Sequence, residues 1–264
     1  MKGTLSKMPV KYDDPVHYFL KLEEEPVLVN DWIGKQIKLS HTGKIFCINC
    51  GRKTSKSFNQ GFCFPCFRDA PQNAECIIRP ELCRAHLGEG RDPDWEEKHH
   101  NQPHVVYLAI SSVPKVGVTR ATNVPSRWID QGAWKAVKLA ETPNRYQAGL
   151  IETDLKQYFS DRTPWQRMLK NELADELEVL ETKNKMQELM DNKYNEFDSS
   201  DDEIYEMHYP VIEYPTKVKS HNLDKEPMLE GKLMGVKGQY WLLEGGKVIN
   251  IRKYGGYEVE IEVR

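Results

Sequence analysis

The sequence has no long apolar run, and this absence limits the kind of protein that it can encode. No stretch approaches the roughly 18 consecutive apolar residues that a membrane-spanning helix needs. Its first residues, MKGTLSKMPVKYDD, lack the apolar core of a secretory signal peptide. With 39% hydrophobic and 29% charged residues, the composition is that of a soluble globular protein. We therefore expect a cytoplasmic location and no membrane partner.

The chain also lacks the overall positive charge that would be the simplest sign of a nucleic-acid ligand. Its formal net charge is −3, but this average hides an asymmetry. Residues 171–206 hold 13 acidic residues and 3 lysines, so this segment carries −10 and leaves +7 on the rest of the chain. A basic body with an acidic segment is compatible with a polyanionic ligand, and a solvated acidic face explains the pattern as simply.

Four of the six cysteines form two closely spaced pairs. Cys47 and Cys50 enclose Ile-Asn, and Cys63 and Cys66 enclose Phe-Pro. Without a secretion signal, metal binding is favoured over disulfide bonds. Each pair can direct two thiolates at one ion, and two pairs supply the four soft ligands that tetrahedral Zn²⁺ prefers. The spacing predicts a closed structural zinc site; iron of the rubredoxin type is the less common alternative.

The two remaining cysteines predict a second, weaker cluster. Cys76, Cys83 and His86 lie close in sequence, and His100 and His104 follow. Two cysteines and two histidines would complete another tetrahedral zinc site, with His100 or His104 as the fourth ligand. The alternative is that these residues are unconnected.

Hydrophobic periodicity and turn residues predict a mixture of helices and strands. Leucines at helical spacing predict one long helix over 165–195, and shorter helices are expected over 125–131 and 144–159. Residues 196–206 are expected to form an acidic loop. The predicted strands, several bounded by glycines, are 27–29, 36–39, 211–214, 232–236, 240–243, 248–252 and 257–263.

The stretch VVYLAISSVPKVGVTRATNVPSRW, residues 105–128, predicts a hairpin with an unusual set of polar residues. Tyr107 lies on its first strand, Lys115 and Gly117 lie on its second, and Arg127 follows ten residues after Gly117. This order, with Glu152 in a later predicted helix, resembles the GIY-YIG nuclease superfamily over about residues 104–170. Val106-Tyr107-Leu108 matches the first motif, and Lys115-Val116-Gly117 matches the second.

The resemblance implies a phosphodiester-cleaving site. Glu152 would hold one Mg²⁺ or Mn²⁺, and Arg127 would grip the scissile phosphate. Tyr107 would orient or deprotonate the attacking water, with Lys115 standing where the family has its second tyrosine. Gln131 stands where the family often has an aromatic residue or histidine. Residues expected to bind nucleic acid beside this site are Gly117, Thr119 and Arg120.

Nearly the whole chain also resembles an uncharacterised bacterial family, the domain of unknown function 2797. This likeness rests on the Cys47–Cys66 pairs, on 105–109, 115–120 and 127–133, and on Gly238-Gln239-Tyr240. The resulting expectation is an α+β fold: a β region with zinc knuckles over 1–104, a GIY-YIG-like core over 105–195, the acidic loop over 196–206, and a small antiparallel sheet or barrel over 207–264.

Two functions follow from these expectations. The first is a metal-dependent nuclease acting on DNA or RNA. The alternative is a non-catalytic, zinc-containing nucleic-acid-binding protein that uses an inactive GIY-YIG-like fold, and a protein-interaction scaffold is a third reading. Convergence of Tyr107, Lys115, Arg127 and Glu152 on one open cleft would favour cleavage, whereas a buried cluster would favour binding or scaffolding.

Overall fold

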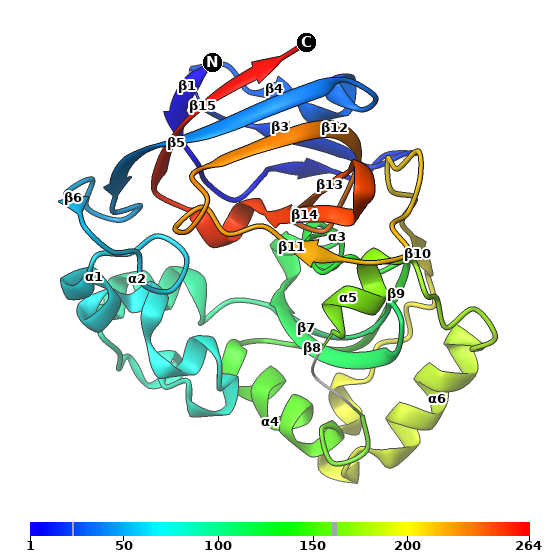
Figure 1. Cartoon of the computed structure of the whole chain (residues 1–264). Coiled ribbons are helices and arrows are strands. Elements are labelled where there is room, and N and C mark those ends of the chain that lie inside the picture. Colours follow the sequence, from blue (N-terminus) through cyan, green and yellow to red (C-terminus); the bar gives the residue numbers. More distant parts are fainter. Residues whose placement is uncertain (23, 160–162) are drawn as a thin grey trace. The chain divides into compact units, whose positions relative to one another are not determined.

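The computed structural model describes residues 1–22, 24–159 and 163–264 (Figure 1). These residues form a mixed α+β protein, and their strands make three sheets. Contacts between Cα atoms divide the chain into two compact units. Unit 1 comprises Met1–Arg68, Ile129–Gly132 and Met207–Arg264, and unit 2 comprises Asp69–Trp128 and Ala133–Glu206.

The large sheet of unit 1 joins the two ends of the sequence. Its strand order is β1-β15-β5-β12-β13-β14-β11, and β6 also pairs with β5. The long strand β5 lies between β15 and β12, where Leu39 pairs with both Ile261 and Leu229 (Figure 1). The bounds of these strands are Lys2–Thr4 (β1), Gln36–Phe46 (β5), Lys53–Thr54 (β6), Lys219–Ser220 (β11), Met228–Lys237 (β12), Tyr240–Leu243 (β13), Lys247–Asn250 (β14) and Tyr257–Val263 (β15).

This pairing differs from the expected succession of separate β regions at 1–104 and 207–264. The reason is that apolar residues alternate along both strands and give each one a buried face: Ile37 and Leu39 on β5, and Val259 and Ile261 on β15. An apolar face on one strand needs a matching strand beside it, and here that partner lies some 220 residues away in sequence. A three-stranded sheet of β2 (Val10–Lys11), β3 (His17–Leu20) and β4 (Val27–Leu28) completes the strands of unit 1.

Unit 2 is built on a four-stranded antiparallel sheet of order β10-β9-β7-β8. Alternate apolar residues of β7 and β8 pack against helix α4 and form the main core of this unit with helix α6. The bounds are Pro93–His99 (α2), His104–Ile110 (β7), Pro114–Arg120 (β8), Ser126–Asp130 (α3, which runs into unit 1), Lys135–Thr142 (β9), Arg145–Leu155 (α4), Trp165–Leu169 (α5), Val179–Leu189 (α6) and Tyr205–Glu206 (β10). Helix α1, Phe64–Asp69, follows the third cysteine.

The long helix predicted over 165–195 is wrong, because α5 ends at Leu169 and α6 begins only at Val179. Asn171 adopts the left-handed conformation, with φ of 58°, and this breaks the helix. Closely spaced acidic residues, including Asp175 and Glu178, also repel one another on a helix. Residues 211–214 likewise form no strand; Val211 makes an isolated bridge to Gly235.

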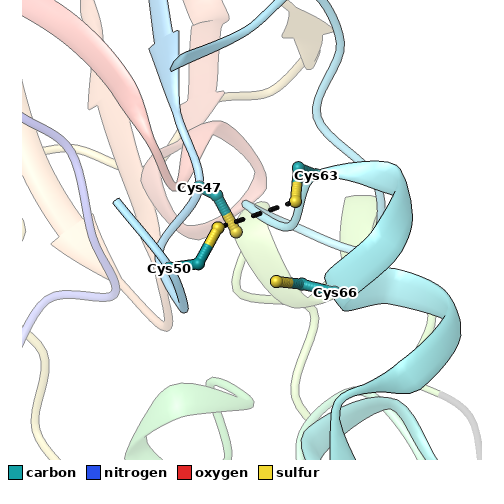
Figure 2. Close-up of side chains that lie close together, drawn as sticks. All are labelled: Cys47, Cys50, Cys63 and Cys66. Carbon is teal, nitrogen blue, oxygen red and sulfur yellow. Dashed lines mark hydrogen bonds between the residues drawn. The ribbon is translucent and has the colours of Figure 1, made fainter. Parts of the chain in front are cut away.

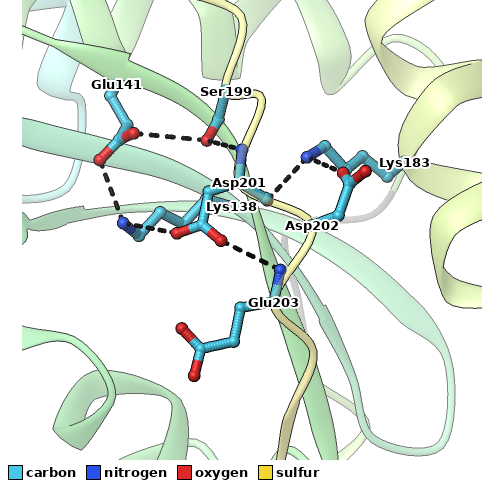
Figure 3. Close-up of polar contacts among 7 residues, drawn as sticks. All are labelled: Lys138, Glu141, Lys183, Ser199, Asp201, Asp202 and Glu203. Atoms are coloured by element: carbon cyan, nitrogen blue, oxygen red, sulfur yellow. Dashed lines mark hydrogen bonds and ion pairs between the residues drawn. The ribbon is translucent and has the colours of Figure 1, made fainter.

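The acidic segment 196–206 is held by lysines instead of lying free in solvent. Lys183, whose side chain is almost fully buried, donates to the Asp202 carboxylate at 2.7 Å and to the Asp201 carbonyl oxygen at 2.8 Å. Lys138 pairs with Asp201 at 3.0 Å and with Glu141 at 3.2 Å (Figure 3). Part of the negative charge of this segment is therefore neutralised within unit 2.

Candidate functional site

The four cysteines predicted to bind zinc converge. The Sγ atoms of Cys47, Cys50, Cys63 and Cys66 all lie within 4.8 Å of one another, and Cys50 and Cys63 are 3.8 Å apart (Figure 2). Cys47 follows the last residue of β5, and Cys66 lies on α1. The group could hold a metal ion, and four thiolates in this arrangement are consistent with zinc.

Backbone hydrogen bonds shape the first cysteine pair. Gly51 donates its N–H to the Cys47 carbonyl oxygen at 2.9 Å and has a φ of 70°, so a residue without Cβ suits the turn. Burial raises the pKa of the Cys47 thiol, but backbone N–H groups of Cys63, Cys50 and Asn49 stabilise its thiolate and bring the pKa down to about 6. These N–H groups prepare this sulfur to bind a cation.

The second predicted cluster assembles with a changed composition. Cys76, Cys83 and His100 come together, and Glu96 joins them. His86 instead stacks on Tyr146, with ring centroids 4.6 Å apart. His104 also lies outside the group: its Nδ1 is 2.6 Å from the Gln102 carbonyl oxygen, and burial lowers its pKa to about 4.

Three of the four predicted catalytic residues are buried. Tyr107 and Lys115 of the β7–β8 hairpin are 0% and 6% exposed, and Glu152 of helix α4 is 7% exposed. Tyr107 pairs with Gly117 across the ladder, and Ala109 pairs with Lys115. Paired residues point to the same face of a sheet, so Tyr107, Gly117 and Lys115 share one face. Tyr107 packs there against Trp128, with ring centroids 5.8 Å apart.

Helix α4, which carries Glu152, covers the other face of this hairpin. The alternate residues Val106, Leu108 and Val116 form a core there with Ile151 and Leu155 of α4. Tyr107 and Lys115 therefore point away from the face that α4 covers. The Glu152 carboxylate pairs with Lys156, one turn further along the same helix, at 3.2 Å.

Arg145 is a functional candidate that the sequence did not single out. Its guanidinium donates to the carbonyl oxygens of Cys76 and Ile77, both at 2.9 Å. Burial lowers its pKa; nearby Cys76, Cys83 and Glu152 oppose this shift, and Arg127 adds to it. Arg127, Glu152 and the cysteines of the second cluster are thus all close enough to Arg145 to affect its pKa.

Two of the residues predicted to contact nucleic acid are not fully accessible. Thr119 is buried, and Arg120 is half-buried, with burial lowering the Arg120 pKa.

An exposed surface on the cysteine knuckles combines basic and aromatic side chains. Phe64 is 55% exposed and Phe67 is 40% exposed. Both contact Phe58, with ring centroids 5.6 and 5.7 Å away, and Lys56 lies over the Phe58 ring. We use the name knuckle surface for Lys56, Phe58, Phe64 and Phe67 together with Arg52, Lys53 and Arg68, which are exposed in the same segment of the chain. Residues 41–68 contain no Asp or Glu, which is the signal that could have identified it.

Unit 1 carries a second basic feature, a lysine-lined groove near β11 and β14. Its cavity volume is about 440 Å³. The lining residues are Lys219, Ser220, His221, Asn222, Lys225, Glu226, Lys247 and Lys253. Four lysines against one glutamate give the groove a positive potential.

Fold and site together define a mixed α+β protein with a four-cysteine group able to hold a metal ion. The family model described as "Protein of unknown function (DUF2797)" matches residues 34–259, and the chain belongs to that family. Comparison with curated proteins and with solved structures gave no match. No helix in the described part of the chain is both long and apolar enough to cross a membrane.

Proposed function

We propose that this chain is a zinc-containing protein that binds single-stranded nucleic acid without cleaving it. The observation that carries the proposal is the knuckle surface, where exposed phenylalanines stand among cations. Unstacked bases gain about 1–3 kcal/mol each by stacking on aromatic side chains, and neighbouring cations attract the phosphates. Duplex bases are already stacked on one another, so such a surface favours single strands.

Zinc supports this function by fixing the surface. Residues 47–67 contain only short elements, β6 and α1, and both phenylalanines of α1 are exposed. A tetrahedral ion held by Cys47, Cys50, Cys63 and Cys66 would tie the loop to the end of β5. Phe64 and Phe67 flank Cys66 on the same helix, so the ion would also orient the two rings.

The lysine-lined groove provides a second place for phosphate contacts within unit 1. Lysine ammonium groups act as point charges toward phosphate and do not read sequence. This predicts binding with little sequence preference and strong dependence on salt.

Cleavage by a GIY-YIG-like site is the second candidate function. It is favoured by the order of elements: a β7–β8 hairpin, helix α3 with Arg127, strand β9, and helix α4 with Glu152. Under this reading Glu152 would bind Mg²⁺ or Mn²⁺, and Arg127 would stabilise charge on the phosphate. The burial of Tyr107 and Lys115, and their direction away from the face that α4 covers, favour binding over cleavage.

The direct test is anisotropy of a fluorescent oligothymidine of about 20 nucleotides with the whole zinc-loaded protein. We expect binding at low salt, and we expect Phe64→Ser with Phe67→Ser to weaken it by at least tenfold, since two stacking platforms are lost. Tyr158→Ser is the matched control, because Tyr158 is 54% exposed but lies on unit 2. Absence of binding by the wild-type protein, or equal loss in the control, would overturn the proposal.

A further inference from the structure

We propose that unit 2 holds a second zinc ion, bound by the Sγ atoms of Cys76 and Cys83, Nδ1 of His100 and a carboxylate oxygen of Glu96. This site is separate from the four-cysteine group and from the knuckle surface. Its ligand set differs from the one that the sequence predicts: Glu96 takes the place of His86, and of the two candidates for the fourth ligand His100 belongs to the group and His104 does not.

The four ligands come from two short segments, residues 75–83 and residues 92–100. Cys76 lies in the 3₁₀ helix Glu75–Ile77, and Cys83 directly follows the 3₁₀ helix Pro80–Leu82. Glu96 lies on α2, and His100 directly follows the helix in helical conformation; four residues apart, the two project from the same helical face. Asp92 starts this helix as its N-cap, accepting from the Trp95 N–H at 3.1 Å.

The ligand atoms are close enough to share one ion. All four lie within 4.8 Å of one another, and Cys76 Sγ is 3.8 Å from His100 Nδ1. The Glu96 Oε2 atom contacts the same His100 nitrogen. Neighbouring ligands of a tetrahedral zinc ion lie roughly 3.3–3.8 Å apart, because zinc bonds sulfur at about 2.3 Å and nitrogen or oxygen at about 2.0 Å. Small movements of these side chains would therefore complete the site.

All four proposed ligands are buried, and burying a carboxylate and thiolates without a cation costs free energy. The exposed fractions are 8% for Cys76, 2% for Cys83, 2% for Glu96 and 3% for His100. The other carboxylate oxygen of Glu96, Oε1, is buried and has no hydrogen-bond partner in the described structure. A buried carboxylate beside two thiols needs a positive partner to offset its lost hydration, and a divalent ion supplies that charge.

The surrounding segment also needs a cross-link. Among the described residues, its own apolar cluster contains Cys76, Cys83 and Ala85, with Ala74 and Tyr146 packed beside them. Larger apolar residues point outward; Ile78 is 79% exposed and Leu87 is 55% exposed. A segment with so little core is the kind that a structural metal stabilises. Two thiolates and one imidazole favour zinc, and full burial favours a closed structural site.

The second ion would also fix helix α4. Arg145 holds the carbonyl oxygens of Cys76 and Ile77. Gly149, one turn along, packs so closely on the same segment that a Cβ there would lie 2.2 Å from the Glu81 nitrogen. Loss of the ion should therefore loosen the start of α4 as well as residues 74–87.

The test is the zinc content per chain together with the zinc environment in the whole 264-residue chain. Elemental analysis should give two zinc ions for the wild type and one for Cys83→Ser or His100→Gln. His86→Gln and His104→Gln are the matched controls and should keep two. A wild type with a single zinc that Cys83→Ser retains would overturn the proposal.

Because a cysteine variant could misfold, two further measurements keep the proposal falsifiable. Zinc X-ray absorption on the wild-type protein should show three sulfur ligands per zinc on average, since one site offers four and the other two; an average of four would exclude the second site. Glu96→Gln should lower zinc affinity at least tenfold in competition with a chelator, whereas exposed Glu97→Gln should not; equal affinity would remove Glu96 from the ligand set.

Discussion

Tyr107 and Gly117 face each other across the β7–β8 ladder, and the phenol occupies the space that a side chain at position 117 would need. A Cβ at Gly117 would lie 2.5 Å from the Tyr107 Oη and 2.7 Å from its Cζ. The glycine therefore serves to seat the buried ring, which also packs on Trp128. Tyr107 and Gly117, one from each of the two GIY-YIG-like motifs, are therefore coupled through side-chain packing.

Gly117→Ala should destabilise the protein by about 1–3 kcal/mol, because both the ring and the strand are confined. Tyr107→Leu removes the crowding, so the double variant should be more stable than the sum of the two single changes predicts. Urea unfolding of the four proteins measures this coupling, which we expect to be on the order of 1 kcal/mol or more. Additive changes would show that the two residues do not compete for space.

Removal of the ion from the four-cysteine group should destabilise the chain strongly. We expect Cys50→Ser to lose one zinc and to lower the melting temperature by more than about 10 °C. The reason is that the free energy of binding a structural metal adds directly to the free energy of folding. Asn49→Ala is the control, because it removes only the hydrogen bond from Asn49 Nδ2 to Cys66 Sγ, 3.4 Å long. A zinc-replete Cys50→Ser protein would contradict the assignment of this ligand.

Binding of single strands should become less salt-dependent when cations of the knuckle surface are removed. Each lost phosphate contact lowers the slope of log K against log salt by about 0.7 for single strands. The variant Arg52→Gln with Lys53→Gln and Lys56→Gln should therefore lower it by about 2. Lys185→Gln, an exposed lysine in the acidic part of unit 2, should leave the slope unchanged. Equal slopes of log K against log salt in all proteins would show that Arg52, Lys53 and Lys56 do not contact the phosphates.

We expect the residues of the β7–β8 hairpin and helix α4 not to cleave nucleic acid. Glu152 is almost fully buried and paired with Lys156, so it is poorly placed to take up a hydrated Mg²⁺. We expect no product from labelled single- or double-stranded DNA and RNA with Mg²⁺ or Mn²⁺, and unchanged binding by Glu152→Gln. Metal-dependent cleavage that disappears in both Glu152→Gln and Arg127→Ala would make the second candidate function the correct one.

The parts that the sequence predicts well are local. The Cys47–Cys50 and Cys63–Cys66 pairs could be identified because two-residue spacings direct sulfurs together, and the group assembles as expected. Strand β15 matches the predicted 257–263, because its alternation is regular and glycines precede it. Helix α4 begins after Asn144, which caps it by accepting from the Gln147 N–H.

The parts that the sequence misses depend on distant contacts. Nothing near Gln36–Phe46 indicates that its partners are β12 and β15. Glu96 was missed as a member of the second cluster because an acidic residue on a short helix usually faces solvent, and only the fold brings it to Cys76 and Cys83. The left-handed Asn171 broke a helix whose leucine spacing was regular.

Lys237 provides the last prediction, because it is fully buried at the end of β12. Its Nζ lies 5.1 Å from the centre of the Tyr209 ring and 5.2 Å from that of Tyr214, and burial lowers its pKa from 10.5 to about 7. Between pH 7 and pH 10.5 the Lys237 side chain is protonated in the unfolded chain and neutral in the folded chain. The free energy of unfolding therefore rises with pH from about 7 to about 10.5, and below pH 7 the whole cost of burying the charged lysine lowers stability.

Replacing Lys237 with methionine should remove this cost while filling the same space. We expect Lys237→Met to raise the free energy of unfolding at pH 7 by on the order of 1–3 kcal/mol, less than the whole pKa shift implies because both ring faces stabilise the ammonium. The advantage should shrink toward pH 10, as the wild-type lysine becomes neutral in both states. Chemical unfolding of both proteins from pH 6 to pH 10 measures the difference, with Lys232→Met on the same strand as the control. An advantage that grows with pH would show that Lys237 remains charged in the fold and that the two tyrosine rings hold it as a cation.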